Sequence, residues 1–187
     1  GNFMQRGGPA IIDKWKRAEM AIENGVDLVI ELPTYYAVSS AEFFAYGAVS
    51  ILNSLGIVNN LFFGSESGDV KSLTKIAQTL VNEPLEFQEI LKRNMHNGLT
   101  FAKARELSLI EFTNDKHIEN IISSSNNILG IEYIKAILKL NSKIVPLSLK
   151  REGSGYNDKE LSNSFSSATS IRETLKGKND ISLIKDA

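Results

Sequence analysis

Short apolar runs alternate along the chain with longer segments in which apolar residues recur at helical spacing. Three of the runs, 27–33, 60–64 and 143–149, have the length and composition of strands buried in a sheet. Proline ends the first run and interrupts the third, where it indicates a sheet edge or a strand end. Because these strands alternate with helices, the pattern predicts an α/β fold with a parallel sheet flanked by helices.

The helical segments are separated by glycine, asparagine and proline, which commonly end helices. The predicted helices cover residues 13–24, 40–55, 70–81, 85–95, 100–107 and 128–140, and a last one starts near Thr169. Three strands make a thin sheet, since sheets usually have about five or six. This shortage, together with a first residue that is Gly rather than Met, indicates that an N-terminal strand–helix–strand unit is missing. A processed start or a tag remnant is the alternative explanation of the first residue.

Composition adds few constraints to this picture. The 187 residues suit one domain, or one domain with a small appendage. The net charge of −1 produces no strong overall electrostatic field that would attract nucleic acid or a membrane. The absence of cysteine excludes disulfides, thiolate metal sites and a thiol nucleophile, and it agrees with a reducing cytosol. No apolar run is long enough to span a bilayer. His96 and His117 are isolated, so no metal site is predicted.

Two candidate segments follow predicted strands, at the edge where open α/β sheets bind ligands. Residues 64–68 read Gly-Ser-Glu-Ser-Gly, and their glycines allow the backbone to approach a ligand closely. Residues 150–156 place Lys150 and Arg151 beside two glycines, and the planar guanidinium of Arg151 suits phosphate oxygens. A plain strand-to-helix turn and a solvated loop explain these segments equally well.

Two further segments open predicted helices. Residues 166–172, Ser-Ser-Ala-Thr-Ser-Ile-Arg, combine capping hydroxyls, free backbone N–H groups and Arg172, which together suit a phosphate without a P-loop. A well-capped structural helix is the alternative, and the residue pattern by itself slightly favours it. Asn126 and Asn127 either cap their helix or read a nucleobase or ribose edge, because an amide both donates and accepts.

Six short motifs follow one another along nearly the whole chain. They are GNFMQRG at 1–7, KWKRA at 14–18, DLVIELP at 27–33, FFGSE at 62–66, NNILGIEY at 126–133 and SATSIR at 167–172. Each motif by itself is weak evidence for any one family, but six motifs in this order are specific evidence. The series resembles the tRNA(Met) cytidine acetate ligase family of the nucleotidyltransferase-like superfamily.

The resemblance implies a Rossmann-like, nucleotidyltransferase-type parallel sheet flanked by helices, lacking its first strand–helix–strand unit. It assigns residues 1–187 to one N-terminally truncated ATP-binding domain. Within that domain it implies a helical insertion at about 70–125. The last residues would begin a following tRNA-binding region.

The resemblance also implies an ATP-dependent ligase in the cytoplasm, not bound to a membrane. Such an enzyme activates acetate to acetyl-adenylate and then acetylates N4 of the wobble cytidine in elongator tRNA(Met). Mg²⁺ is expected to accompany ATP, held mainly by phosphate and water. No catalytic residue is assigned. Carried over by motif, the residues expected to bind ATP are Gly64, Asn126, Arg151, Thr169 and Arg172.

The sequence departs from the family pattern near its start. The H-x-G-H-type motif that lines the triphosphate would lie before Gly1, and Gly8 stands where an acidic residue is expected. The chain by itself is therefore predicted to be inactive. Two other functions stay open: an adenylyltransferase of the same fold acting on a small phosphorylated metabolite, and a non-catalytic nucleotide- or RNA-binding module.

Overall fold

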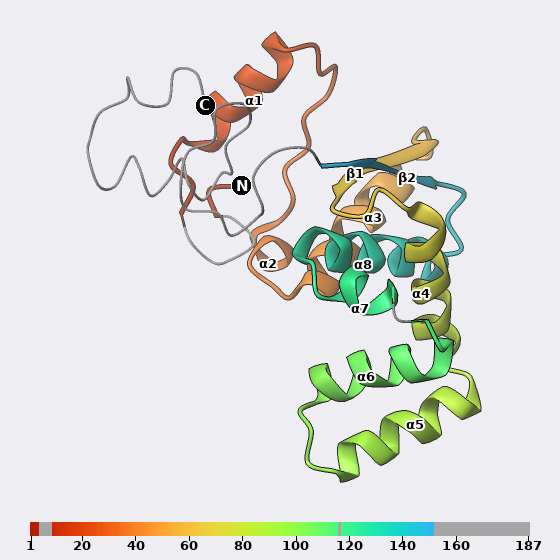
Figure 1. The fold of residues 1–187 in the computed structure, drawn as a ribbon. Helices are drawn as coiled ribbons and strands as arrows, with labels where there is room; N and C mark the ends of the chain where they lie inside the picture. The colour runs from red at the N-terminus through yellow and green to blue at the C-terminus, as the bar shows by residue number, and fades with distance from the viewer. Residues whose placement is uncertain (4–8, 116, 152–187) are drawn as a thin grey trace. The chain divides into compact units, whose positions relative to one another are not determined.

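The structure is a computed structural model that describes residues 1–3, 9–115 and 117–151. Residues Gly1–Lys150 form one compact unit, in which helices and strands follow one another along the chain (Figure 1). Its elements are α1 (Lys14–Glu23), α2 (Thr34–Ala37), α3 (Ala41–Leu55), β1 (Asn60–Ser65), α4 (Val70–Asn82), α5 (Leu85–His96), α6 (Phe101–Thr113), α7 (His117–Ile122), α8 (Ser125–Lys139) and β2 (Val145–Lys150).

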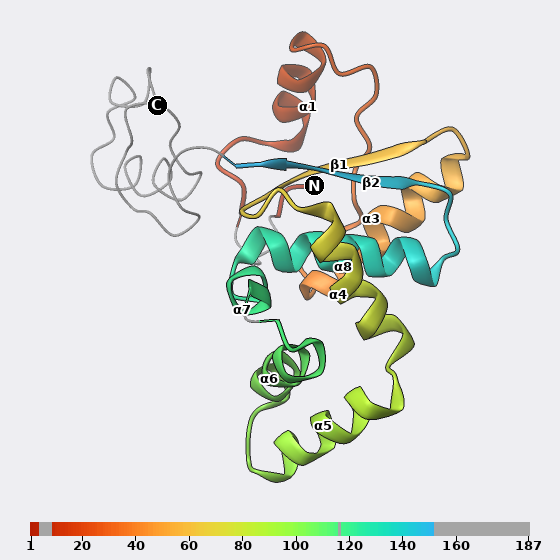
Figure 2. The ribbon, with the colours of Figure 1, turned by 45° about the vertical axis from the view of Figure 1, so that its right-hand side comes forward.

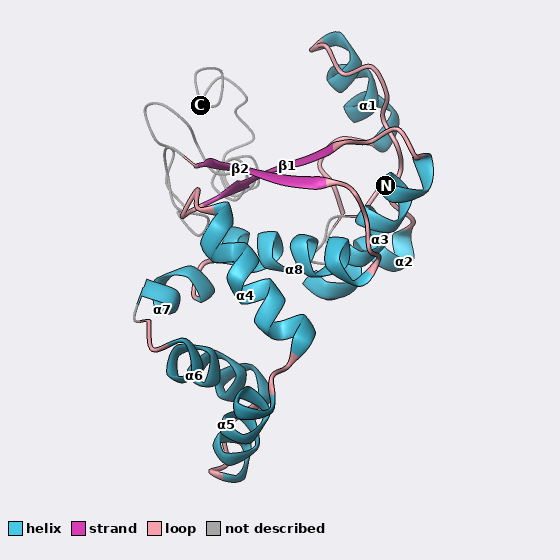
Figure 3. Ribbon diagram, turned by 90° about the vertical axis from the view of Figure 1, so that its right-hand side faces the viewer, coloured by secondary structure: helices cyan, strands magenta, loops and turns pink. Residues whose placement is uncertain are grey.

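The two strands pair in parallel and in full register, from Asn60 opposite Val145 to Ser65 opposite Lys150. Helices α3, α4 and α8 lie on one side of the strands (Figures 2 and 3), and α8 packs directly against β1. A parallel pair needs a long crossover connection, and here it is made by the helices from α4 to α8. The predicted α/β fold with a parallel sheet and flanking helices is confirmed.

The face of the sheet that turns away from α8 is open within the described residues. Phe63 and Ser65 are buried on the α8 side, whereas Phe62, Leu147 and Leu149 are 62%, 41% and 61% exposed. Side chains alternate between the two faces of a strand, so this pattern marks one covered face and one open face. The prediction that β1 is fully buried is therefore wrong for one of its two faces.

The strand predicted over residues 27–33 does not form in the described structure. The segment between α1 and α2 has no regular secondary structure, and Leu28 and Ile30 are 60% and 41% exposed. A parallel strand is stabilised by backbone hydrogen bonds to its neighbours. No strand of the described part of the chain pairs with this segment, which explains why its apolar side chains stay in solvent.

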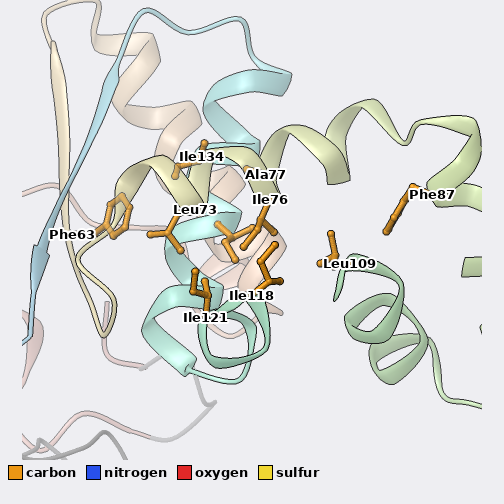
Figure 4. Close-up of a cluster of buried hydrophobic side chains, with 10 residues drawn as sticks. Phe63, Leu73, Ile76, Ala77, Phe87, Leu109, Ile118, Ile121 and Ile134 are labelled. Carbon is orange, nitrogen blue, oxygen red and sulfur yellow. The ribbon is translucent and has the colours of Figure 1, made fainter. Parts of the chain in front are cut away.

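The main core lies beneath the strands and continues toward α5 and α6. Figure 4 shows Leu73 and Ile76 of α4 close to Ile118 and Ile121 of α7, with Phe63 of β1 at one end of the cluster. Phe87 of α5 and Leu109 of α6 continue the cluster on the side away from the strands (Figure 4).

Gly130 lets α8 approach β1 closely. A Cβ atom on Gly130 would lie 2.5 Å from Cε2 of Phe63, closer than two carbon atoms can pack. Glycine lowers helix propensity, so its presence inside α8 indicates that the close helix–strand contact outweighs this cost. The ring of Phe63 fills the space that a side chain at this position would occupy.

Most predicted helices are confirmed with small shifts of their ends. The N-termini of α1 and α4 are fixed by Asp13 and Asp69, whose carboxylates accept hydrogen bonds from backbone N–H groups of the first turn. Helix α6 runs to Thr113 rather than to Leu107. The short helices α2 and α7 were not predicted, because so few residues show no clear periodicity.

Candidate functional site

The carboxyl ends of β1 and β2 meet at one edge of the sheet. Gly64 lies opposite Leu149, one pair before the strands end, and it is exposed. Arg151 follows β2 directly in the chain and is also exposed. The two segments lie at the ends of the strands as predicted, although β1 runs on to Ser65 and β2 to Lys150, and the pairing of these two strands as neighbours is an observation of the structure.

The loop that follows β1 is held against the end of β2. The buried hydroxyl of Ser65 lies 2.6 Å from the hydroxyl of Ser148 and accepts a hydrogen bond of 2.9 Å from the backbone N–H of Gly68. Gly68 has a φ of +66°, and a Cβ atom there would lie 2.8 Å from Cβ of Lys150. Both the backbone conformation and the close approach require glycine at this position.

Glu66, in the middle of this loop, caps the N-terminus of α8. Its Oε1 accepts hydrogen bonds from the backbone N–H and the side-chain Nδ2 of Asn126, at 3.2 and 2.8 Å. Its Oε2 accepts a hydrogen bond of 2.9 Å from the backbone N–H of Asn127. A carboxylate at this place satisfies unpaired donors of the first turn and interacts favourably with the helix dipole.

Asn127 completes a reciprocal connection between the loop and the helix. Its side chain is only 1% exposed, and its Oδ1 accepts a hydrogen bond of 3.1 Å from the backbone N–H of Ser67. The loop therefore caps the helix through Glu66, while the helix holds the loop through Asn127. The loop and the first turn of α8 therefore fix each other's position through these hydrogen bonds.

Of the two alternatives left open for Asn126 and Asn127, the one in which either residue is the helix cap is excluded by the structure. Helix α8 starts at Ser125, three residues before the predicted start at Ile128, and both asparagines lie in its first turn. The N-cap residue, Ser124, makes no capping hydrogen bond through its side chain. The acceptors come instead from Glu66, which is far away in the sequence and leaves no local capping signal.

These hydrogen bonds keep Glu66 ionised. Burial acts to raise the pKa of its carboxyl group, but the hydrogen bonds from the Asn126 side chain and from the backbone N–H groups of Glu66, Asn126 and Asn127 outweigh it. The pKa of Glu66 is therefore held below its usual value of 4.5.

Replacing Glu66 by Gln is expected to make the stability of the protein less sensitive to acid. Because the folded-state pKa is lowered, the carboxylate stabilises the fold fully above pH 4.5, and this contribution is lost as pH falls through the folded-state pKa. The Tm of the wild-type protein should therefore fall more steeply between about pH 5 and 3 than the Tm of Glu66→Gln. Glu89→Gln, which changes an exposed carboxylate of α5, should keep the wild-type slope. Equal slopes for all three proteins would contradict the ionised capping role.

A second cluster of charges lies along α8 and was not predicted. Lys135 Nζ is 2.7 Å from Glu132 Oε2 and 3.5 Å from Glu42 Oε1, and the side chains of Lys135 and Glu132 are 7% and 4% exposed. Lys139 Nζ lies 3.0 Å from the same Glu42 oxygen, and Arg105 lies 3.8 Å from Glu132 Oε1. The cluster connects α3, α6 and α8. Its only sequence signal is the pair of opposite charges three residues apart on one helix.

The remaining predicted site residues, Thr169 and Arg172, lie outside the described residues. Within the described ranges no three His, Cys, Asp or Glu side chains are grouped so that they could hold a metal ion. None of the helices in these ranges is both long and apolar enough to cross a membrane.

Three comparisons relate the chain to known proteins. The HIGH nucleotidyl transferase family model matches residues 1–187. A Clostridium botulinum (strain Hall) protein named tRNA(Met) cytidine acetate ligase is 55% identical over 191 residues, covering 100% of this chain and 47% of the relative. The chain thus spans about half the length of the curated relatives it matches.

Solved structures agree with these sequence matches. The apo crystal structure of Thermotoga maritima TmcAL superposes with a TM-score of 0.93 at 40% identity, over 100% of this chain and 45% of that one. The T. maritima TmcAL structure bound with alpha-thio ATP superposes with a TM-score of 0.85 at 41% identity, over 96% of this chain and 42% of that one. The nucleotidyltransferase-type fold predicted from the motifs is confirmed.

Proposed function

Because the chain belongs to the HIGH nucleotidyltransferase family, we propose that its full-length protein is an ATP-dependent tRNA(Met) cytidine acetate ligase. The observation that carries the proposal is the 41% identity to TmcAL bound with alpha-thio ATP, over 96% of the chain. The hydrogen-bonded loop at the carboxyl edge of the strands supports it, because open α/β sheets bind ligands at this edge. The proposed substrates are ATP, acetate and elongator tRNA(Met), and the proposed location is the cytoplasm.

The ATP contacts divide into two proposed groups. Gly64 and Asn126 flank the loop after β1, where exposed backbone and an amide suit the nucleoside. Arg151, Thr169 and Arg172 supply guanidinium and hydroxyl groups for the phosphates. Glu66 is not counted among the ligand contacts, because both of its oxygens are used by α8.

The proposed chemistry has two steps. A carboxylate oxygen of acetate attacks the α-phosphorus of ATP, and the bond to the bridging oxygen breaks to release pyrophosphate. The N4 amine of cytidine then attacks the acetyl carbonyl carbon, loses a proton and displaces AMP. Charge on the phosphates grows in the first step, so positioned cations such as Arg151 accelerate it. The described residues offer no carboxylate cluster for Mg²⁺, so none of them is assigned to the metal.

The test is acetate-dependent exchange of pyrophosphate into ATP by the full-length protein without tRNA. We expect exchange with acetate, and Arg151→Ala should lower its rate by roughly 100-fold, as for removal of one group that stabilises transition-state charge. Lys143→Ala, which removes an exposed cation just before β2, is the matched control and should leave the rate unchanged. Exchange with another acid but not with acetate would overturn the substrate. Exchange unaffected by Arg151→Ala would overturn the proposed role of that residue.

A further inference from the structure

The side-chain amide of Asn126 has one possible orientation in this structure. Its Nδ2 lies 2.8 Å from Glu66 Oε1, and a carboxylate can only accept hydrogen bonds. Turning the amide over would bring two oxygens face to face, so the nitrogen must face Glu66. Oδ1 therefore points to the other side of the amide, and no residue of the described ranges donates a hydrogen bond to it.

The carboxylate of Glu66 also changes which ligand groups can approach α8. The N-terminus of a helix usually attracts phosphate through its free N–H groups and its dipole. Here the backbone N–H groups of Asn126 and Asn127 already donate to Glu66. A phosphate placed beside them would lose these donors and would meet a like charge.

We propose that Glu66 is a positioning residue that presents Asn126 Oδ1 as an acceptor to a hydrogen-bond donor of the nucleoside. The carboxylate at the same time excludes the triphosphate from the N-terminus of α8. The inference rests on the proposed function, since it takes ATP as the ligand. The donors available on the nucleoside are the ribose hydroxyls and the exocyclic amine of adenine.

The inference is tested by measuring the Kd of the full-length protein for ATP and for inorganic tripolyphosphate, which lacks the nucleoside. The Glu66→Gln substitution leaves one acceptor oxygen and one amide donor facing the three donors of Asn126 and Asn127, so the Asn126 amide is held less firmly. The Kd for ATP should rise about tenfold, the effect of one ordinary hydrogen bond. The Kd for tripolyphosphate should stay the same or fall, because a negative charge has been removed. Glu89→Gln should change neither value.

Two further variants separate positioning from a purely structural effect. Asn126→Ala keeps the backbone donors to Glu66 and should show the same selective loss of ATP affinity. This variant therefore tests the inference even if Glu66→Gln does not fold. Adding Glu66→Gln to Asn126→Ala should weaken ATP binding no further, because both substitutions act on the same hydrogen bond between Asn126 Oδ1 and the nucleoside. Comparing 2′-deoxy-ATP, 3′-deoxy-ATP and ITP with ATP identifies the donor. One of these analogues should bind the wild-type protein about tenfold more weakly than ATP does. The same analogue should bind Asn126→Ala as tightly as ATP does.

Two results would overturn the inference. One is that Asn126→Ala loses as much affinity for tripolyphosphate as for ATP. The other is that the wild-type protein binds tripolyphosphate as tightly as ATP. A protein that binds ATP with the expected pattern but shows no acetate-dependent exchange would support the inference and overturn only the proposed function.

Discussion

Replacing Glu132 by Leu is expected to lower the free energy of unfolding of α8 and its neighbours by about 3 to 5 kcal/mol. The side chains of Glu132 and Lys135 are 4% and 7% exposed and lie 2.7 Å apart. Without Glu132, the buried ammonium of Lys135 keeps, among the residues that the structure describes, only Glu42 as an acidic partner, at 3.5 Å. An incompletely paired buried charge is far more costly than a missing surface ion pair. The loss should appear as faster hydrogen exchange of the α8 backbone amides.

The double variant distinguishes this explanation from a simple packing defect. Replacing Glu132 by Leu and Lys135 by Met removes both charges and should recover most of the lost protection, because well-packed apolar residues often replace a buried ion pair without cost. Glu89→Leu, at an exposed position of α5, should have little effect. A double variant that is no more stable than Glu132→Leu would show that the charge of Lys135 is not the cause.

Replacing Phe87 by Ala is expected to destabilise α5 and α6 by about 3 to 5 kcal/mol, while β1 and α8 stay protected. Phe87 is 1% exposed, and its ring packs edge-on against Phe112 at a centroid distance of 5.9 Å. The buried residues of α5 are Phe87 and Ile90, so the helix has few other core contacts. The measurement is hydrogen exchange, which should accelerate by at least about 100-fold in α5 and α6.

A control on the same helix tests whether the effect comes from burial. Leu85 is 78% exposed, so Leu85→Ala should leave the exchange of α5 nearly unchanged. If Phe87→Ala instead accelerated exchange equally in α5, α8 and β1, the two helices would unfold together with the rest of the unit. That result would contradict the expectation of local unfolding.

Elements with local signals could be predicted from the sequence. The apolar spacing of α1 and α4 and the break at Pro84 are visible in the sequence, so the ends of α1 and α4 and the start of α5 were predicted within one residue. The strand over residues 27–33 was predicted from its apolar run, but a strand also needs a neighbour, which no apolar run reveals.

The candidate site was predicted only in outline. The strand positions were enough to place the carboxyl ends of β1 and β2, at Ser65 and Lys150, at one edge of the sheet. The role of Glu66 could not be predicted, because its partners on α8 are 60 and 61 positions away in the sequence. The burial of Glu132 and Lys135 was missed for a related reason. Charges on a helix usually face solvent, and only the packing of α3 and α6 shows that these do not.

The parallel pairing of β1 with β2 has a consequence for how the protein folds. Residues 66–144 lie between the two strands, so their pairing closes a long loop and depends on contacts between distant parts of the chain. The entropy of closing such a loop must be compensated by contacts made earlier, which the helices of this segment can provide locally. The helices should therefore associate before β1 and β2 pair. The connection between Ser65 and Ser148 would then form in one of the last folding steps.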